Sequence, residues 1–227
     1  MSVLVPLAST VIMSLFTILV FWQYLRRRKV YQLVWGIGLA MFSLAVLCEF
    51  LAGIRGWSPF IYRAWYLFGA ILNVAYLGLG TIYLLARRSI AHTLMALVVI
   101  ASLLLAIVVF TVNINPAALR QIDVTGRVSV KIMPLWVRIL GPAVLNTFGT
   151  LALVGGAFYS AWVFWRKRVM PHRVLSNVLI ALGALVVAAS GTLATLGSTN
   201  YLFVGELVGG TLIFIGFLKS TGPEGAV

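Results

Sequence analysis

The stretch Ile90-Ala-His-Thr-Leu-Met-Ala-Leu-Val-Val-Ile-Ala-Ser-Leu-Leu-Leu-Ala-Ile-Val-Val-Phe-Thr-Val112 contains no Lys, Arg, Asp or Glu. About 20 apolar residues are enough for a helix to cross the hydrocarbon core of a bilayer. The rest of the chain has the same character, with 62% hydrophobic and 9% charged residues overall. A soluble domain carries about a quarter charged residues, because its surface faces water. The composition therefore excludes an ordinary soluble protein and indicates a membrane protein.

Seven apolar segments of this length follow one another along the chain. We predict an all-α fold, a polytopic membrane bundle with a single domain over residues 1–227. Its seven transmembrane helices are expected near residues 5–25, 31–54, 61–86, 90–112, 135–165, 173–197 and 200–219. The fifth segment is longer than one crossing needs, so we expect it to tilt or to project beyond the bilayer. In the seventh, Gly205 and Gly209 have the spacing that lets two helix backbones approach closely.

Lys and Arg residues lie in short clusters between these segments and predict the orientation of the chain. With the N-terminus outside, the cytoplasmic segments contain 11 of the 17 basic residues and the outer segments contain 6. Cytoplasmic loops carry the excess of Lys and Arg, so we predict an N-out, C-in topology in a cell membrane, of the bacterial cytoplasmic type. Tryptophans near segment ends fit the aromatic belts of membrane interfaces: Trp22, Trp57, Trp65, Trp136 and Trp165.

The chain carries a net charge of +13, and the positions of its Lys and Arg residues indicate which partners this charge suits. The basic residues sit where a membrane protein places them, so we expect membrane lipids as partners and no nucleic acid. Cys48 is the single cysteine and lies in an apolar segment, which excludes a disulfide framework. His92 and His172 begin the fourth and sixth segments and read as solvated interfacial residues rather than as ligands of a haem. We therefore expect no metal and no cofactor.

One loop, residues 113–134, is long. Residues 121–130 alternate apolar and polar side chains around Thr125-Gly126, a pattern typical of a hairpin that covers the outer end of the bundle. An irregular connector fits equally well. About eight residues follow the last segment, so we expect no output domain there.

Two aromatic motifs recur and are compatible with duplication. Phe21-Trp22 ends the first segment and Phe164-Trp165 ends the fifth, each before a basic cluster. Tyr66-Leu67-Phe68 lies in the third segment and Tyr201-Leu202-Phe203 opens the seventh. This spacing is compatible with parallel repeats of three helices joined by one further helix, a 3+1+3 architecture that some transporters use.

Two ionisable residues lie within the segments, Glu49 in the second and Glu206 in the seventh. Such groups are costly in a bilayer and usually face the bundle interior. Counting residues from the segment ends places both carboxyl groups roughly 8–9 Å below the outer interface. We predict that they share one site with at least one of Arg63 and Arg138, which begin the third and fifth segments.

The third segment presents a polar face toward the interior. Residues on this face recur at spacings of three and four, as neighbours on a helix do: Tyr62, Tyr66, Gly69, Asn73, Tyr76, Gly80 and Tyr83. Asn146, Thr150, Thr192 and Thr195 are candidates to face it from the fifth and sixth segments. The predicted ligand-binding or interior polar cluster comprises Glu49, Glu206, Arg63, Arg138, Tyr66, Asn73, Tyr76, Asn146 and Thr192. The alternative is that these groups only hold helices together by hydrogen bonds.

The second and third segments carry a resemblance. Its residues are Trp35-Gly36, then Phe42, Leu44, Ala45, Glu49 and Phe50, then Tyr62-Arg63, Tyr66-Leu67 and Gly69. Over about 50 residues this text resembles the seven-helix sensor regions of bacterial histidine kinases, and it is also similar to small uncharacterised bacterial seven-helix proteins. The first resemblance implies a ligand- or lipid-sensing bundle whose output belongs to a partner protein. No kinase domain accompanies it.

Two functional hypotheses follow. The first is a non-enzymatic, sensor-like module that binds a hydrophobic or small ligand, or another membrane subunit, through a polar pocket in its outer half. The second is a small-solute transporter of the 3+1+3 type, which requires a path to both faces. A membrane-embedded enzyme ranks third, because two carboxyl groups could act as acid and base but no nucleophile or metal set accompanies them.

Overall fold

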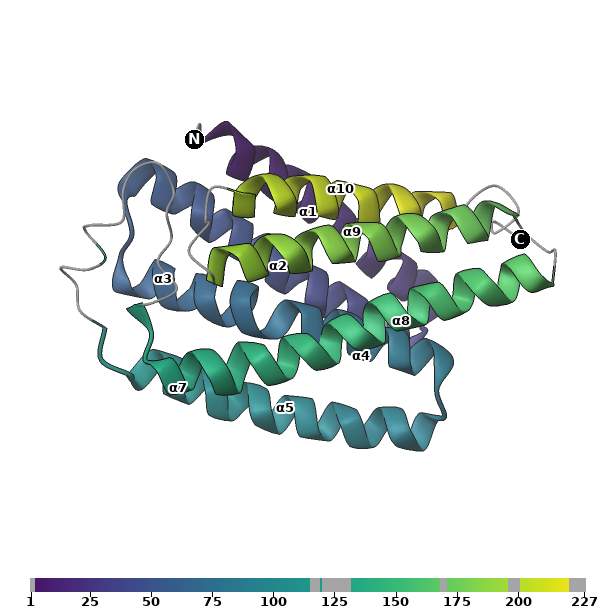
Figure 1. Cartoon of the computed structure of the whole chain (residues 1–227), viewed down its shortest axis with the longest axis horizontal. Coiled ribbons are helices and arrows are strands. Elements are labelled where there is room, and N and C mark those ends of the chain that lie inside the picture. The colour runs from purple at the N-terminus through teal and green to yellow at the C-terminus, as the bar shows by residue number, and fades with distance from the viewer. Residues whose placement is uncertain (1–2, 115–118, 120–131, 168–170, 196–200, 221–227) are drawn as a thin grey trace.

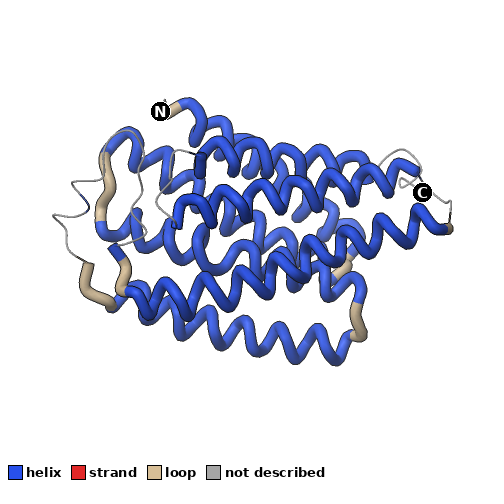
Figure 2. Tube along the Cα trace, viewed as in Figure 1, coloured by secondary structure: helices blue, strands red, loops and turns tan. Residues whose placement is uncertain are grey.

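The computed structural model describes residues 3–114, 119, 132–167, 171–195 and 201–220. These residues form an all-α bundle with seven helices long and apolar enough to cross a membrane (Figures 1 and 2). The predicted fold class is confirmed. The first helix begins at one end of the bundle and the last ends at the other (Figure 1). We call the end where the first helix begins the outer end, following the predicted orientation. The predicted hairpin at 121–130 lies outside the described residues.

Each crossing lies within two residues of its predicted range. The third and fifth crossings are helices in three parts, each with a short π-helical segment, η1 or η3. In chain order the parts are α1 (Leu4–Arg27), α2 (Val30–Arg55), α3 (Pro59–Trp65), η1 (Tyr66–Leu72), α4 (Asn73–Leu85), α5 (Arg88–Thr111), α7 (Leu135–Arg138), η3 (Ile139–Ala143), α8 (Val144–Arg166), α9 (Pro171–Thr195) and α10 (Leu202–Ser220).

Local sequence explains where the early helices end. After α1, Arg28 adopts a left-handed conformation with φ of 51°, and its N–H donates to the Tyr24 carbonyl at 2.7 Å. Arg26 and Arg27 lie in the last turn of α1, where positive charge interacts favourably with the helix dipole. Ser58 caps α3 by accepting a hydrogen bond from the Ile61 N–H at 3.2 Å.

The two π segments contact each other in the outer half of the bundle. Pro142 lies inside η3 and has no N–H to donate, which interrupts the regular hydrogen-bond ladder of the fifth crossing. In η1 the Ala70 carbonyl accepts a hydrogen bond from Asn146 Nδ2 at 2.8 Å. Backbone groups in a bilayer must find protein partners, so this amide stabilises the irregular turn and joins the third crossing to the fifth.

Six of the crossings form a closed ring. The order of contacts around it is α1, α2, α4, α8, α9 and α10, and α10 packs back on α1. The remaining helix, α5, lies outside the ring and packs on α4 and η1 (Figure 1). The first three crossings and the last three therefore form two groups with the same order of contacts, and the fourth crossing is peripheral. This arrangement is compatible with a 3+1+3 architecture.

Glycines allow the ring helices to approach closely. A Cβ on Gly149 would overlap the Val74 carbonyl, where α8 meets α4. A Cβ on Gly209 would lie 2.6 Å from the Gly183 carbonyl oxygen, where α10 meets α9. These contacts confirm the expectation of close packing for Gly205 and Gly209, since Gly205 likewise meets Ser190. In lipid such close van der Waals packing is a main source of helix association.

Substituting Gly149 with Ala tests this packing. We expect Gly149→Ala to destabilise the protein by about 1–3 kcal/mol, because the backbones of α4 and α8 must separate. The matched control is Gly155→Ala on the same helix, where a Cβ meets no atom within 4 Å. This control should be neutral or slightly stabilising, since Ala favours a helix. Thermal unfolding in detergent micelles measures both, and equal effects would contradict the interpretation.

Candidate functional site

The centre of the candidate site is a pair of buried carboxyl groups. Glu49 on α2 is 3% exposed and Glu206 on α10 is 9% exposed. Their carboxyl groups lie close enough to each other to share a hydrogen bond. The helices α2 and α10 both pack against α1, so the two side chains meet across the interior of the ring. The structure therefore brings together the two residues that the depth argument paired.

A tryptophan orients the first of these carboxyl groups. Trp65, at the end of α3, donates its Nε1–H to Glu49 Oε1 at 2.8 Å. Sequence reasoning placed Trp65 in an interfacial aromatic belt, which is wrong, because the side chain is 4% exposed. A signal was available in its position: Trp65 precedes Tyr66 and follows Tyr62 by three residues, so it borders the interior face of the third crossing.

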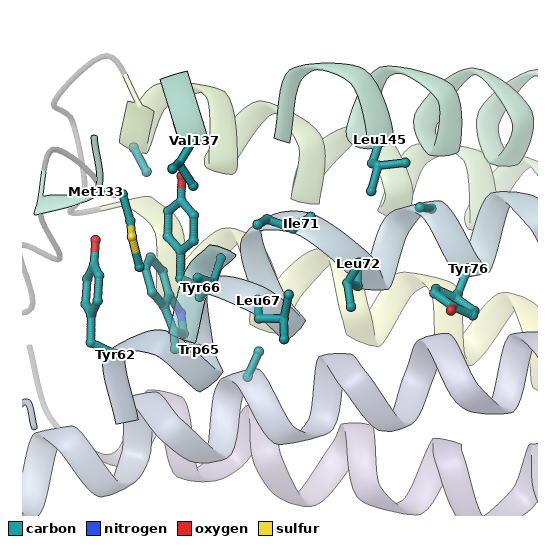
Figure 3. Close-up of a cluster of buried hydrophobic side chains, with 14 of the residues drawn as sticks. Tyr62, Trp65, Tyr66, Leu67, Ile71, Leu72, Tyr76, Met133, Val137 and Leu145 are labelled. Carbon is teal, nitrogen blue, oxygen red and sulfur yellow. The ribbon is translucent and has the colours of Figure 1, made fainter. Parts of the chain in front are cut away.

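Aromatic rings fill the outer half of the bundle beside the carboxyl pair. Tyr62 and Tyr66 are fully buried, and their ring centroids lie 6.1 Å apart. The Trp65 and Tyr62 ring centroids lie 5.7 Å apart. Met133 lies between Tyr62 and the other two rings, and Val137 lies beside the end of Tyr66 (Figure 3). Aromatic pairs at these separations contribute more stability than the burial of their apolar area alone. This aromatic cluster therefore fills the outer half of the bundle beside the carboxyl pair.

Neither Arg63 nor Arg138 of the described structure pairs with the two glutamates, although the sequence predicts this for at least one of them. Arg63 donates to the carbonyls of Phe110 and Val112, the latter at 2.7 Å, and so closes the last turn of α5. Arg138 lies within electrostatic range of the phenol groups of Tyr62 and Tyr66. Among the described residues no arginine forms an ion pair with either glutamate. The described polar contacts of the carboxyl pair are therefore the hydrogen bond from Trp65 and the contact between the two carboxyl groups.

The remaining predicted residues are distributed around the bundle. Tyr76 contacts Ser102 between α4 and α5, with the two hydroxyl oxygens 3.3 Å apart. Thr192 is exposed on α9, where its hydroxyl donates to the Ala188 carbonyl at 2.8 Å. Asn73 is buried, and its Oδ1 accepts a hydrogen bond from the Val74 N–H at 2.6 Å. The nine residues do not form one cluster; Glu49 and Glu206 meet, and Tyr66 and Arg138 lie in the neighbouring aromatic cluster.

A cavity enclosed by the described helices of the ring lies in its inner half. This inner chamber has a cavity volume of about 80 Å³ and is partly open. Every helix of the ring contributes to its walls: Phe16, Val20, Trp35, Leu39, Leu77, Thr81, Leu84, Leu153, Gly156, Ala157, Ser160, Asn177, Ile180, Ile213 and Phe217. Sequence reasoning missed it, because these residues read as ordinary apolar helix positions and only their convergence makes a chamber.

A smaller middle cavity lies between the chamber and the carboxyl pair. Asn73 and Thr150 are its polar lining residues. Leu77, Leu153 and Ile213 line both spaces and therefore form the partition between them. Glu49 lies seven residues closer to the outer end of α2 than Phe42, which lines the middle cavity. At 1.5 Å per residue this is about 10 Å.

The site offers no metal centre in the part of the chain that the structure describes, where no three His, Cys, Asp or Glu residues lie close enough to hold an ion. Comparisons of the chain with protein-family models, with curated proteins and with solved structures find no match.

Trp65→Phe tests the role of the indole. Phe fills most of the same volume but cannot donate to Glu49, so a buried carboxyl oxygen loses its partner. We expect a loss of about 1–3 kcal/mol of stability, measured by thermal unfolding in detergent. Trp136→Phe is the matched control, because Trp136 is half exposed at the beginning of the fifth crossing. A loss as large in the control would show that the hydrogen bond is not the cause.

Proposed function

We propose that this protein is a transporter that carries a small, mostly apolar solute across the membrane by alternating access. The observation that carries the proposal is the inner chamber, to which each of the six ring helices contributes residues. Alternating access needs a site at the interface of two helical groups, which rock against each other around it. The membrane location rests on the seven apolar helices.

The walls of the inner chamber indicate the chemistry of the solute. The described residues that line it include no Lys, Arg, Asp or Glu, and most are aliphatic or aromatic. Trp35 uses its Nε1–H on the Leu77 carbonyl at 3.1 Å, while Asn177 donates to the Arg173 carbonyl at 2.8 Å. The Ser160 hydroxyl and the Asn177 carbonyl oxygen are left to orient a ligand. A few polar groups in an apolar cavity suit an uncharged molecule with one or two hydrogen-bonding atoms.

The contacts between the two three-helix groups support relative movement. One seam, between α4 and α8, has a backbone contact at Gly78 and Gly149, and Thr81 of α4 packs on Gly156 beside it. The other, between α1 and α10, is formed by flexible or planar side chains: Met13 meets Gly210, and Phe16 stacks on Phe214 with centroids 5.0 Å apart. The outer half of the described bundle is packed, and the cavity of about 80 Å³ lies in its inner half, on the side that an inward-facing state would open.

A sensor-like binding module is the second candidate, and one observation favours it. Residues that carry the resemblance to histidine-kinase sensor regions lie together in the bundle: a Cβ on Gly69 would meet the Cβ of Ala45 at 2.9 Å, and Glu49 accepts the bond from Trp65 beside Tyr66. A module of this kind would bind its ligand in the same chamber but would never open it to the outside.

Cysteine accessibility distinguishes the two candidates. In a Cys48→Ala background, Thr150→Cys places a thiol in the middle cavity, and a membrane-impermeant maleimide is applied to either face of proteoliposomes. Transport predicts labelling from both faces, because each conformation opens the cavity to one side. A sensing module predicts no labelling from the outer face. Leu151→Cys is the control: this neighbouring position is 70% exposed toward lipid and should react slowly from both faces.

A further inference from the structure

The carboxyl pair connects the two three-helix groups in the outer half. Glu49 belongs to the first group and Glu206 to the second, and their helices are not neighbours in the ring. Glu49 Oε2 and Glu206 Oε2 are both buried, and neither receives a hydrogen bond from a donor among the described residues. Two carboxyl groups can hydrogen-bond each other only if one carries a proton. A hydrogen bond across this contact therefore needs one bound proton.

A third buried oxygen without a partner lies at the same level. Ser9 on α1 is 2% exposed, and its hydroxyl has no described hydrogen-bond partner. It lies one turn before Met13, which contacts Gly210, and Glu206 lies one turn before Gly210. The helices α1 and α10 run parallel, so the same register places Ser9 at the level of Glu206, with no hydrogen bond between the two side chains. A hydroxyl can both donate and accept, which suits it to a carboxyl group that gains and loses a proton.

The charged and titratable groups around the pair do not replace that proton. The titratable neighbour on α2 is Cys48. The titratable groups on α3 and η1 are Tyr62 and Tyr66 of the adjoining aromatic cluster. Arg138 of α7 acts on the two phenols, and no described cation is paired with either glutamate. Trp65 donates one hydrogen bond to Glu49. Two carboxylates in contact here would repel each other without a counter-charge.

We propose that Glu49, Glu206 and Ser9 form a single-proton site that closes the outer half of the bundle and couples opening to proton release. With the proton bound, the O–H of one glutamate donates to the carboxylate of the other and holds the two groups together. On release, the O–H bond breaks, the proton passes to outer water, and two carboxylates repel. The outer half then opens, and proton uptake closes it again. This inference rests on the proposed transport function.

Infrared spectroscopy tests the shared proton directly. The chain has only four acidic side chains, so Asp123→Asn with Glu224→Gln leaves the pair as the only side-chain carboxyls. We expect one carbonyl band of a protonated acid and the bands of one carboxylate at neutral pH. Glu49→Gln or Glu206→Gln should each shift the bands of the remaining residue, and the double variant should remove them. Two carboxylates, or two acids whose bands do not respond to each other's substitution, would overturn the proposal.

Accessibility tests the coupling. In the Thr150→Cys reporter, labelling from the outer face should rise on going from acidic to alkaline pH by about five- to tenfold more than in the same reporter with Glu206→Gln, within the range of coupling between sites in proteins. Both proteins carry the same thiol, so the pH dependence of the thiol reaction itself cancels in this comparison. The Gln variant has only one carboxyl group in the pair and cannot form two carboxylates. Equal pH profiles in the two proteins would refute the coupling. A rise driven by Na⁺ at constant pH would instead indicate a metal-cation site and would also refute it.

The two proposals fail separately. If the reporter is never labelled from the outer face at any pH, the transport function and the coupling are both wrong, while the infrared bands still decide whether the pair holds one proton. If the reporter is labelled from both faces with equal pH profiles, transport stands and the coupling is wrong. Size-exclusion chromatography of each Gln variant in detergent establishes that it is folded before either measurement.

Discussion

A bilayer offers no water to unpaired polar groups, and this constraint governs every irregular feature of the bundle. Where the fifth crossing contains Pro142 and the third widens into η1, Asn146 supplies the missing hydrogen bond to Ala70. Where α5 ends, Arg63 donates to its last carbonyls. The same constraint makes the contact between Glu49 and Glu206 informative, because neither carboxyl group could be buried there without a partner.

Lipid also removes the hydrophobic drive that assembles soluble proteins, so packing has to supply the association between helices. In this chain glycines allow this packing at contacts between neighbouring helices of the ring: Gly149 meets α4, and Gly183 of α9 meets Gly209 of α10. Such seams join helices through short backbone contacts and leave the larger side chains for the interior. The apolar side chains that line the axis then decide where the interior is filled and where it is hollow.

The interior is divided along its axis. Toward the outer end, the aromatic cluster and the carboxyl pair fill the space between the two three-helix groups. Toward the inner end, the six helices leave the chamber, with Leu77, Leu153 and Ile213 as the partition beneath the middle cavity. This asymmetry links the two proposals, because a proton-dependent contact on the filled side is well placed to control access to the hollow side. The peripheral α5 takes no part in either space.

The sequence by itself determined the seven crossings, their bounds to within two residues, and the common depth of Glu49 and Glu206. Length, hydropathy and the rise of a helix are local properties, so residue counting is enough for them. Only the tertiary structure decided that the two carboxyl groups meet, that Trp65 turns inward to Glu49, that Arg63 serves α5, and that Thr192 faces out. Helical periodicity assigns a residue to a face of its own helix, but it does not say which helix lies opposite that face.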